Sequence, residues 1–545
     1  MIKLQNVKFA YRVNGKVFSI TTDKSASNQR VSLDISYENG LFSASVKTRT
    51  PIELLRLSAE FEYIYTVRDR IFLNGYQSWT DSIEHRPDSV MMGIDQIPAP
   101  IAYTYAFSQY GDYNFTRYSH KRGVMHGYSY GYIRNEEHYD LIGSLSENSG
   151  FTCIRTNISK NRLMAFKDCH QLRVNSEFEG LKLYFGEGTQ DQVFDGYFAA
   201  LDIPKPDAKP IFGYTSWYKH YQDISEEKLI NDLEGILDCE HKADVFQIDD
   251  GYQTAVGDWL SIDEEKFPNS LKPISQRISQ AGLIPGLWLA PFVCEEKSEI
   301  FKNHRDWIVT NEKGGLVKGG SNWSGFYALD IYNPEVRDHL KKVFDTVIND
   351  WGFKLLKLDF LYAACLQPRE EKTRGMVMCD AMDLLRELTK GAQILGCGVP
   401  LASAFGKVDY CRIGCDVTLD WDDKPYMKLM HRERTSTRNS ILNSVFRRQL
   451  DGRAFLNDPD VFLLRSDNTA LTEVQKQTLA EINSLTGSVL FTSDSLKDYT
   501  DAQNLKLNNL LAFSTWKVTA AELNGKELSL TVSNGSERAI RVYRV

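Results

Sequence analysis

Two short runs, FKLLKLDF (Phe353–Phe360) and DYCRIGCD (Asp409–Asp416), decide how this chain of 545 residues is expected to fold. Each run has the character of a buried strand and carries a carboxylate near its C-terminal end, Asp359 in the first and Asp416 in the second. A carboxylate in the middle of an apolar strand is costly to bury, whereas one at the junction of a barrel strand and its loop faces the active site of a (β/α)8 enzyme. The two runs therefore predict strands of a parallel barrel.

The region around these runs repeats the same pattern. Apolar strand-like runs alternate with helical patterns, which is typical of βαβ units and a parallel sheet. Helices fit Ser225–Leu237, Pro334–Asn349 and Thr472–Leu485, where Pro334 suits a first helical turn and Thr472 an N-cap. The candidate strands predict a closed (β/α)8 TIM barrel; they are Phe212–Trp217, Val245–Asp249, Ile284–Ala290, Leu355–Asp359, Ile394–Cys397, Tyr410–Gly414, Ala454–Leu456 and Val489–Thr492.

Two all-β regions are expected to flank the barrel. Residues 1–205 contain short alternating runs separated by turn residues, which predicts an N-terminal β-sandwich of the Greek-key type. Its runs include Val31–Tyr37, Leu41–Val46, Phe61–Val67 and Leu181–Phe185. The three prolines of Leu201–Pro210 deny a helix and indicate a stiff linker, so the barrel is assigned to residues 206–494. Residues 495–545 return to short alternating runs, LLAFSTW, ELSLTVS and AIRVYRV, and predict a small C-terminal β domain.

Composition and charge limit the class of partner. A formal net charge of −8 and a pI near 5.8 argue against nucleic acid or an anionic membrane, since both need clustered positive charge. No apolar core of a signal peptide and no membrane-spanning stretch is found, so we expect a cytoplasmic protein. The nine cysteines favour free thiols, and Cys411 and Cys415 lack the partners of a zinc site. We expect neither a metal nor an organic cofactor; the sequence leaves a homo-oligomer open.

Polar and aromatic residues gather at the predicted carboxyl ends of the strands, the face that carries the active site in barrel enzymes. Strand alternation places Lys357 and Asp359 on the same side, where the lysine would keep the aspartate ionised, as a nucleophile requires. A protonated Asp416 would supply a general acid, and such a pair is that of a retaining glycosidase. The other residues at these ends are Trp217, Tyr218, Asp249, Asp250, Trp288, Cys397 and Arg412.

Structural alternatives exist for each of these residues taken alone. A single aspartate at a strand end can be a helix N-cap, and the Asp249-Asp250-Gly251 sequence can be a turn. Trp217 and Trp288 can pack in the core instead of stacking on a sugar ring. Arg412 can be a buried salt-bridge partner. The joint pattern favours the site.

Eight strings along this region resemble bacterial α-galactosidases (melibiases) of glycoside hydrolase family 36. They occur in family order and are GYTSWY (213–218), VFQIDDGY (245–252), GDWL (257–260), IPGLWLAPF (284–292), KLLKLDFLYA (354–363), ILGCGVPL (394–401), CRIGCD (411–416) and FLNDPD (455–460).

The resemblance implies a role for each candidate residue. Asp359 would attack the anomeric carbon to form a covalent glycosyl-enzyme, and Asp416 would protonate the leaving oxygen and later deprotonate water. The implied contacts to galactose are Asp249 and Asp250 on the 4- and 6-hydroxyls, Lys357 on the 3- and 4-hydroxyls, Arg412 on the 2- and 3-hydroxyl side, Cys397 near the 2-hydroxyl, and Trp217, Trp288 and Trp79 of NGYQSW as pocket walls.

The expected substrates are small oligosaccharides with a terminal α-galactose, such as melibiose and raffinose. Two positions depart from the family pattern, since Thr215 stands where cysteine is frequent and Cys415 where proline or serine is common. These changes leave an α-N-acetylgalactosaminidase open as an alternative. Galactosyl transfer to a sugar acceptor is a second alternative, and a sugar-binding protein without catalysis is a third, disfavoured because both candidate catalytic aspartates are present.

Overall fold

The computed structural model describes residues 2–238, 241–422, 425–513 and 515–545. Its central element is a parallel sheet to which every predicted barrel strand contributes. In spatial order the sheet consists of β25 (Leu456–Asp458), β24 (Tyr410–Arg412), β23 (Gln393–Gly396), β22 (Leu355–Leu358), β18 (Ile284–Leu289), β17 (Val245–Ile248), β16 (Ile211–Thr215), β27 (Val489–Thr492) and β26 (Val461–Phe462).

The sheet curves back on itself in a way that is consistent with a barrel. Its two outermost strands, β25 and β26, are consecutive in the chain, and only residues 459–460 separate them. The strand predicted at Ala454–Leu456 is found two residues later, as β25. Residues 459–460 interrupt it before the chain continues as β26. The end of the strand predicted at Phe212–Trp217 was wrong by two residues. β16 ends at Thr215, and Trp217 begins the short helix α3 (Trp217–His220).

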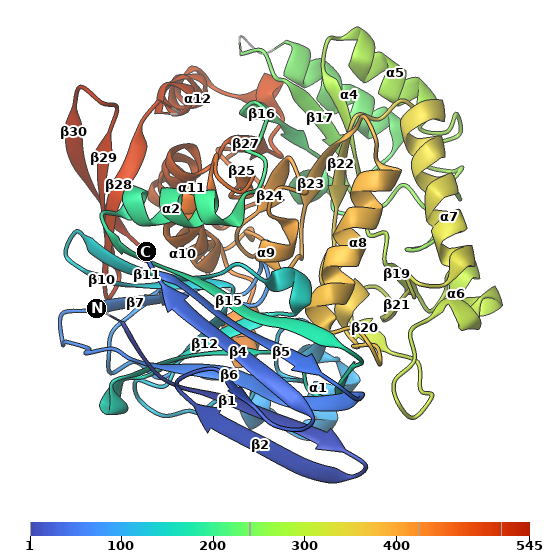
Figure 1. Cartoon of the computed structure of the whole chain (residues 1–545). Coiled ribbons are helices and arrows are strands. Elements are labelled where there is room, and N and C mark those ends of the chain that lie inside the picture. The colour runs from blue at the N-terminus through green and yellow to red at the C-terminus, as the bar shows by residue number, and fades with distance from the viewer. Residues whose placement is uncertain (1, 239–240, 423–424, 514) are drawn as a thin grey trace.

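Helices cover the outside of the parallel sheet, as Figure 1 shows for α4 (Glu226–Leu237), α5 (Lys272–Gln280), α7 (Pro334–Asp345) and α8 (Arg374–Leu388). The predicted cap at Thr472 is confirmed, since Thr472 and Gln475 form a capping box at the start of α11 (Glu473–Thr486). None of the helices in the described part of the chain has both the length and the apolar character needed to cross a lipid bilayer.

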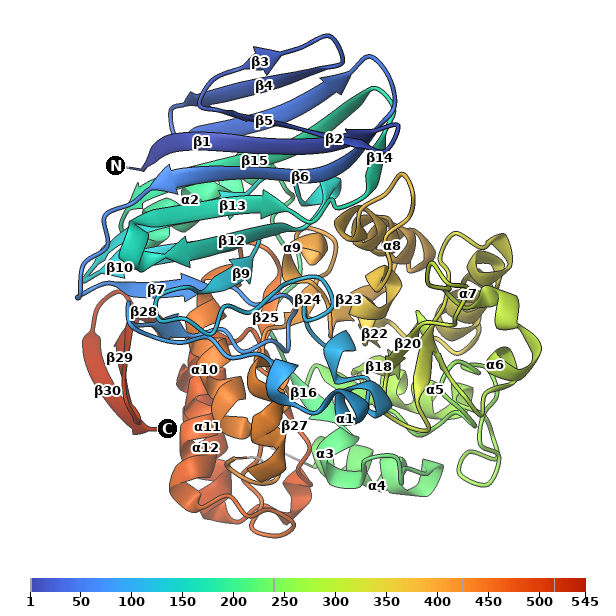
Figure 2. The same ribbon diagram turned by 90° about the horizontal axis from the view of Figure 1, so that it is seen from below.

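Two antiparallel sheets form the N-terminal part, visible as two layers in Figure 2. One has the order β2 (Lys16–Thr22), β1 (Lys3–Val13), β6 (Ile52–Glu62), β13 (Arg162–Lys167), β12 (Thr152–Asn157) and β9 (His126–Tyr128), with β14 (Leu172–Val174) also on β6. The other runs β3 (Ala26–Ser27), β4 (Val31–Glu38), β5 (Leu41–Thr48), β15 (Glu177–Gly188), β11 (His138–Ser144), β10 (Tyr130–Asn135), β7 (Arg70–Leu73) and β8 (Glu84–His85). A separate apolar core, with Val7, Phe42 and Leu183 among its members, fills the space between these layers.

Two N-terminal details differ from the prediction. The run Phe61–Val67 is a strand only as far as Glu62, because Thr66 turns the chain by donating its backbone N–H and hydroxyl to Asp69. The helix α2 (Gln190–Leu201) was not predicted. Its signal is the Thr189–Gln192 capping box, and it packs on the second sheet, where the Tyr197 hydroxyl donates to the carbonyl of Ser144.

The C-terminal part contains one wrong prediction. The run LLAFSTW reads as a strand, but its start belongs to α12 (Asp501–Phe513), and Ser514 lies outside the described residues. Capping at its N-terminus stabilises this helix. The Thr500 N–H donates to Gln503 Oε1, and the Gln503 N–H donates to Thr500 Oγ1. The β prediction holds after it, in a three-stranded sheet of β28 (Lys517–Asn524), β29 (Glu527–Ser533) and β30 (Arg538–Arg544).

A buried ion pair joins this small sheet to the N-terminal layers. Arg134 of β10 contacts Glu84 at 2.5 Å and Glu522 of β28 at 2.8 Å, and the Glu84 side chain is only 3% exposed. We expect Arg134→Met to lower the free energy of unfolding by about 3–5 kcal/mol, because it leaves Glu84 buried without its cation. Arg70→Met is the matched control, since Arg70 also pairs with Glu522 but is more exposed, and should cost about 1 kcal/mol or less. Urea unfolding measures both, and equal losses would contradict the expectation.

Candidate functional site

One cavity of about 340 Å³ lies at the carboxyl ends of the parallel strands, the end at which the sequence places the site. Eight of the ten candidate site residues line it, namely Trp79, Trp217, Asp249, Asp250, Trp288, Lys357, Asp359 and Asp416. The other two lie directly behind this wall, where Arg412 donates to Asp416 and the Trp79 Nε1–H donates to Cys397 Sγ at 3.4 Å. The structure therefore brings the predicted set together.

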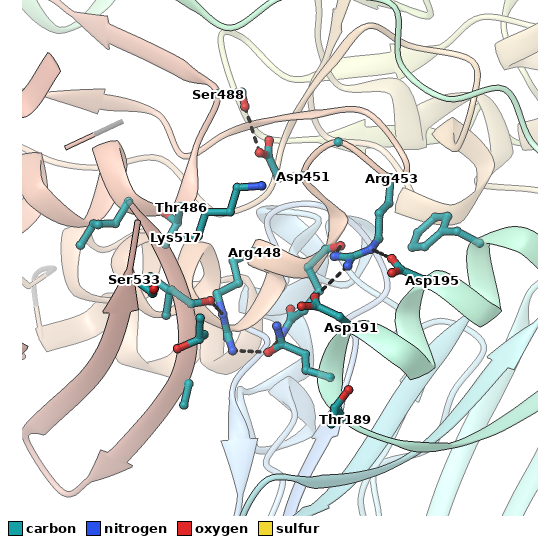
Figure 3. Close-up of a pocket in the computed structure, with 18 of the residues that line it drawn as sticks. Thr189, Asp191, Asp195, Arg448, Asp451, Arg453, Thr486, Ser488, Lys517 and Ser533 are labelled. Atoms are coloured by element: carbon teal, nitrogen blue, oxygen red, sulfur yellow. Dashed lines mark hydrogen bonds and ion pairs between the residues drawn. The ribbon is translucent and has the colours of Figure 1, made fainter. Parts of the chain in front are cut away.

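A larger cavity of about 1290 Å³ occupies the opposite end of the sheet. Its wall includes Pro210, which precedes β16, and Ser488, which precedes β27, so it lies at the amino ends of the strands. Figure 3 shows Arg453 reaching Asp195 and Asp191 of α2 across it. Because the catalytic groups of barrel enzymes sit at the carboxyl ends, this cavity is a junction between the flanking regions and the barrel, and the smaller cavity is the candidate site.

Asp359 follows β22 and points into the cavity. Its Oδ2 accepts the indole N–H of Trp288 at 3.1 Å and its Oδ1 accepts the backbone N–H of Phe360 at 2.8 Å. Burial raises the pKa of Asp359; Lys357 acts in the opposite direction, and Asp416 adds to the increase. A carboxylate with two hydrogen bonds keeps lone pairs free for an attack on a substrate carbon.

Lys357 pairs with a different aspartate than its place in the sequence predicts. Its Nζ lies 2.8 Å from Asp249 Oδ2, which also accepts the side-chain N–H of Gln247 at 2.9 Å. Although burial opposes ionisation, Lys357 lowers the pKa of Asp249, and Asp249 in turn raises that of Lys357. Asp249 and Lys357 therefore form a buried ion pair on the floor of the cavity, with Asp359 beside it.

Asp250 is held by three side-chain donors. Its Oδ2 accepts from Gln222 at 2.7 Å and from the indole N–H of Trp323 at 3.0 Å, and its Oδ1 accepts from Gln253 at 2.5 Å. Burial raises the pKa of Asp250. The alternative that Asp249-Asp250-Gly251 forms a turn is compatible with a functional site. Gly251 has a positive φ of 122°, which lets the chain turn, and both aspartates line the cavity.

Asp416 is the most open of the four carboxylates, with its side chain 46% exposed. Arg412 Nη1 donates to Asp416 Oδ1 at 2.7 Å, while Nη2 donates to Asp460 Oδ1 at 2.9 Å. Arg412 is thus a buried salt-bridge partner and also a neighbour of the site.

The N-terminal part contributes one wall. Trp79 lies edge-on to Phe360, with ring centroids 5.0 Å apart, and its neighbour Thr80 donates to Glu433 Oε1 at 3.0 Å. Glu433 also accepts a hydrogen bond from the Tyr113 hydroxyl, and burial raises its pKa to about 7. The predicted role of Trp79 as a pocket wall fits this position.

Cys415, noted in the sequence only as a departure from the family pattern, also lines the cavity. Sequence reasoning missed the other lining residues, which come from loops and short 3-10 helices; they are Phe107, Tyr110, Ser321, Asn322, Trp323, Phe360, Met430, Glu433 and Thr435. Only Trp323 carries a signal, an aromatic residue in the glycine- and serine-rich loop GGSNWSG. No group of three or more His, Cys, Asp or Glu side chains in the described ranges is arranged to hold a metal ion. All eight cysteines in those ranges are free thiols.

Fold and site together define a class: proteins with a barrel-like parallel sheet and an acidic, tryptophan-lined pocket at the carboxyl ends of its strands. Comparison with known proteins is more specific, because residues 204–375 match the family model "Melibiase", and the predicted resemblance is confirmed.

Curated relatives agree with this match. The chain is 29% identical over 182 residues to an α-galactosidase of Escherichia coli, which covers 30% of this chain and 24% of that protein. It is 24% identical over 252 residues to the α-galactosidase Mel36A of Lactobacillus acidophilus, covering 44% and 32%. The matched part thus spans about a quarter to a third of the length of these relatives.

Solved structures extend the likeness to the whole fold. The α-galactosidase TtGalA from Thermus thermophilus, in complex with p-nitrophenyl α-D-galactopyranoside, has a TM-score of 0.73 at 24% identity over 97% of this chain and 98% of that one. The family 36 α-galactosidase AgaA from Geobacillus stearothermophilus has a TM-score of 0.64 at 12% identity, covering 100% and 79%.

Proposed function

We propose that this chain is a retaining, exo-acting α-galactosidase that removes terminal α-linked galactose from oligosaccharides such as melibiose and raffinose. The observation that carries the proposal is the convergence of Asp359 and Asp416 on one cavity, with the Asp249–Lys357 ion pair at its floor. The relatives named above are α-galactosidases, and one structure of TtGalA holds stachyose.

In this proposal the two carboxyl groups divide the chemistry. Asp359 attacks the anomeric carbon and the bond to the leaving oxygen breaks, while Asp416 gives that oxygen a proton. Water then attacks the glycosyl-enzyme, Asp416 accepts a proton from it, and Asp359 is released with galactose in its original anomeric configuration. The indole of Trp288, which donates to Asp359, orients the nucleophile.

Specificity follows from the polar floor of the cavity. Asp249, Asp250 and Lys357 receive the 3-, 4- and 6-hydroxyls of galactose, and Arg412 and Cys397 lie on the 2-hydroxyl side. An epimer that directs its 4-hydroxyl elsewhere leaves buried charges unpaired, which discriminates strongly. The contact of Trp79 with Cys397 closes the 2-hydroxyl side and favours a plain hydroxyl over an N-acetyl group.

The proposed organisation keeps an N-terminal sandwich of residues 1–205, a catalytic (β/α)8 barrel of residues 206–494 and a C-terminal β domain of residues 495–545. The proposed location is the cytoplasm, where imported oligosaccharides would be the substrates.

The experiment that tests this function is turnover of nitrophenyl α-galactoside, α-N-acetylgalactosaminide and α-glucoside. We expect kcat/KM for the galactoside to exceed that for the glucoside on the order of 10,000-fold, since the 4-hydroxyl decides the pairing of buried charges. A preference for the N-acetyl substrate would reassign the 2-hydroxyl side, and no turnover of any α-galactoside would refute the proposal. Product analysis at high acceptor concentration separates hydrolysis from galactosyl transfer.

A further inference from the structure

The indole of Trp323 links two functional side chains of the cavity. Its Nε1–H donates to Asp250 Oδ2 at 3.0 Å, and its ring meets that of Trp288 edge-on, with ring centroids 6.1 Å apart. Trp288 in turn donates to Asp359. Two tryptophans in contact with each other therefore each hold one carboxylate, the proposed nucleophile in one case and a proposed sugar-binding aspartate in the other.

Trp323 has an unusual backbone conformation. It lies in the turn between the paired strands β20 (Lys318–Gly320) and β21 (Phe326–Ala328), with a φ of 57°. This left-handed conformation is rare for a bulky side chain. Such strain persists only where the surrounding structure enforces it, and it is concentrated at functional sites.

Contacts on both sides of Trp323 enforce this conformation. On one side, the Tyr110 hydroxyl accepts the backbone N–H of Ser321 at 2.9 Å and donates to the side chain of Asn322. On the other side, the Ser324 hydroxyl donates to Glu295 Oε2 at 3.0 Å. The N-terminal part of the chain and the barrel region together therefore fix the position of the indole.

Asp250 has little remaining capacity to accept hydrogen bonds. A carboxylate offers about four lone-pair positions, and Trp323, Gln222 and Gln253 occupy three of them. The position that remains, on Oδ1, can accept one hydroxyl of a bound sugar. Because Asp250 is only 2% exposed, a sugar that lacks this hydroxyl leaves a buried acceptor unpaired.

The neighbouring ion pair indicates which hydroxyl of galactose this is. In the proposed function Lys357 contacts the 3- and 4-hydroxyls, and its Nζ lies 2.8 Å from Asp249 Oδ2. Asp249 is therefore near the 4-hydroxyl, which leaves the 6-hydroxyl to Asp250. The 6-hydroxyl is carried by a rotating CH2 group, so an acceptor that three donors already hold in place binds it at a lower entropic cost.

We propose that Trp323 is a positioning residue that acts through Asp250 to select α-galactosides whose 6-hydroxyl is free. This inference rests on the proposed function and deepens it, because it excludes galactosides that are deoxygenated or substituted at C6. The selection depends on the indole N–H, which fixes the carboxylate that receives the hydroxyl.

The test compares kcat and KM for nitrophenyl α-galactoside and for its 6-deoxy analogue in the wild type and in Trp323→Phe. In the wild type, kcat/KM for the galactoside should exceed that for the analogue by about 10- to 100-fold, the value of a hydrogen bond to a charged group. Phenylalanine keeps an aromatic ring but offers no N–H to Asp250. The ratio should then fall by about 3- to 10-fold, chiefly through a higher KM for the galactoside, because the 6-hydroxyl is bound alike in the ground and transition states.

Two further variants keep the test decisive. Tyr110→Phe leaves the indole in place but removes the hydroxyl that anchors Ser321, so it should lower the same ratio by a smaller factor, even if Trp323→Phe folds poorly. Trp307→Phe is the matched control, since Trp307 is also buried and donates its indole N–H to a carboxylate, Glu335 Oε2 at 2.8 Å, but lies outside the cavity lining. It should leave the ratio unchanged.

The proposal is overturned by a folded Trp323→Phe protein that keeps the wild-type ratio or slows both substrates equally, since either pattern reports a structural role alone. Where that variant does not fold, the same outcomes in Tyr110→Phe overturn it. A wild type that turns over both substrates equally well contradicts the assignment of Asp250 to the 6-hydroxyl. Failure of the proposed function is separate, because it is seen in the wild type as an absence of turnover of the galactoside itself.

Discussion

Asp359→Asn is expected to lower kcat/KM for nitrophenyl α-galactoside by about 10,000-fold or more. The amide has the size of the carboxylate and keeps its place beside Trp288, but it cannot form the covalent glycosyl-enzyme. Steady-state kinetics on purified protein measures the loss. An activity that survives in the variant would show that Asp359 is not the nucleophile.

The stability of the same variant is expected to move in the opposite direction. Because the pKa of Asp359 is raised in the folded chain, ionisation of this group disfavours the folded state at pH values above its unfolded pKa. Replacing it with a neutral amide removes that cost, so the Tm of Asp359→Asn at neutral pH should equal or exceed that of the wild type. A lower Tm would mean that the activity loss reports damage to the fold. With Asp359→Ala, added azide should restore turnover and give the β-linked galactosyl azide.

Lys357→Met is expected to cost both stability and activity. The change leaves Asp249, which is 2% exposed, without its cation and should lower the free energy of unfolding by about 3–5 kcal/mol. It also removes a donor to the sugar hydroxyls, so kcat/KM for the galactoside should fall by roughly 100- to 1,000-fold, as when one partner of a buried charged pair is truncated. Urea unfolding and steady-state kinetics measure the two effects.

Lys167→Met is the matched control for this variant. Lys167 is a buried lysine of the N-terminal sheets, where its Nζ donates to the carbonyls of Ser146 and Gly150 and to the Thr152 hydroxyl. Its replacement should lower stability while leaving kcat/KM of the folded protein unchanged. A Lys357→Met protein with wild-type kcat/KM would contradict the assignment of Lys357 to substrate binding.

The barrel strands could be predicted because their signal is local. A short apolar run marks several of them, and the strand at Val489–Thr492, which reads VLFT, was predicted with its correct ends. The run LLAFSTW has the same apolar character, but the Thr500–Gln503 cap ten residues upstream commits its start to a helix. Periodicity in so short a run cannot separate the two states.

The site could be predicted as a set of residues but not as a set of contacts. Alternation along β22 puts Lys357 and Asp359 on one side, yet the lysine bonds to Asp249 of another strand, because strand spacing says nothing of neighbours across the barrel. Trp323 reaches the cavity from a loop and Glu433 from the end of a 3-10 segment, Pro425–Glu433, and the paths of both segments depend on tertiary packing. The cluster around Arg412 depends on a break in one strand that no local pattern announces.

The N-terminal part supplies one wall of the cavity, and this determines when the cavity can be completed during synthesis. Trp79 meets Cys397 across 318 positions of the chain, and Thr80 meets Glu433 across 353. Contacts of such sequence separation form late, since the intervening chain must be ordered first. A nascent chain that has released the whole N-terminal part and the first barrel strands still has no closed pocket. Under the proposed function, sugar binding begins only after the segment that carries Glu433 has been synthesised, so the sugar cannot assist the folding of the earlier strands.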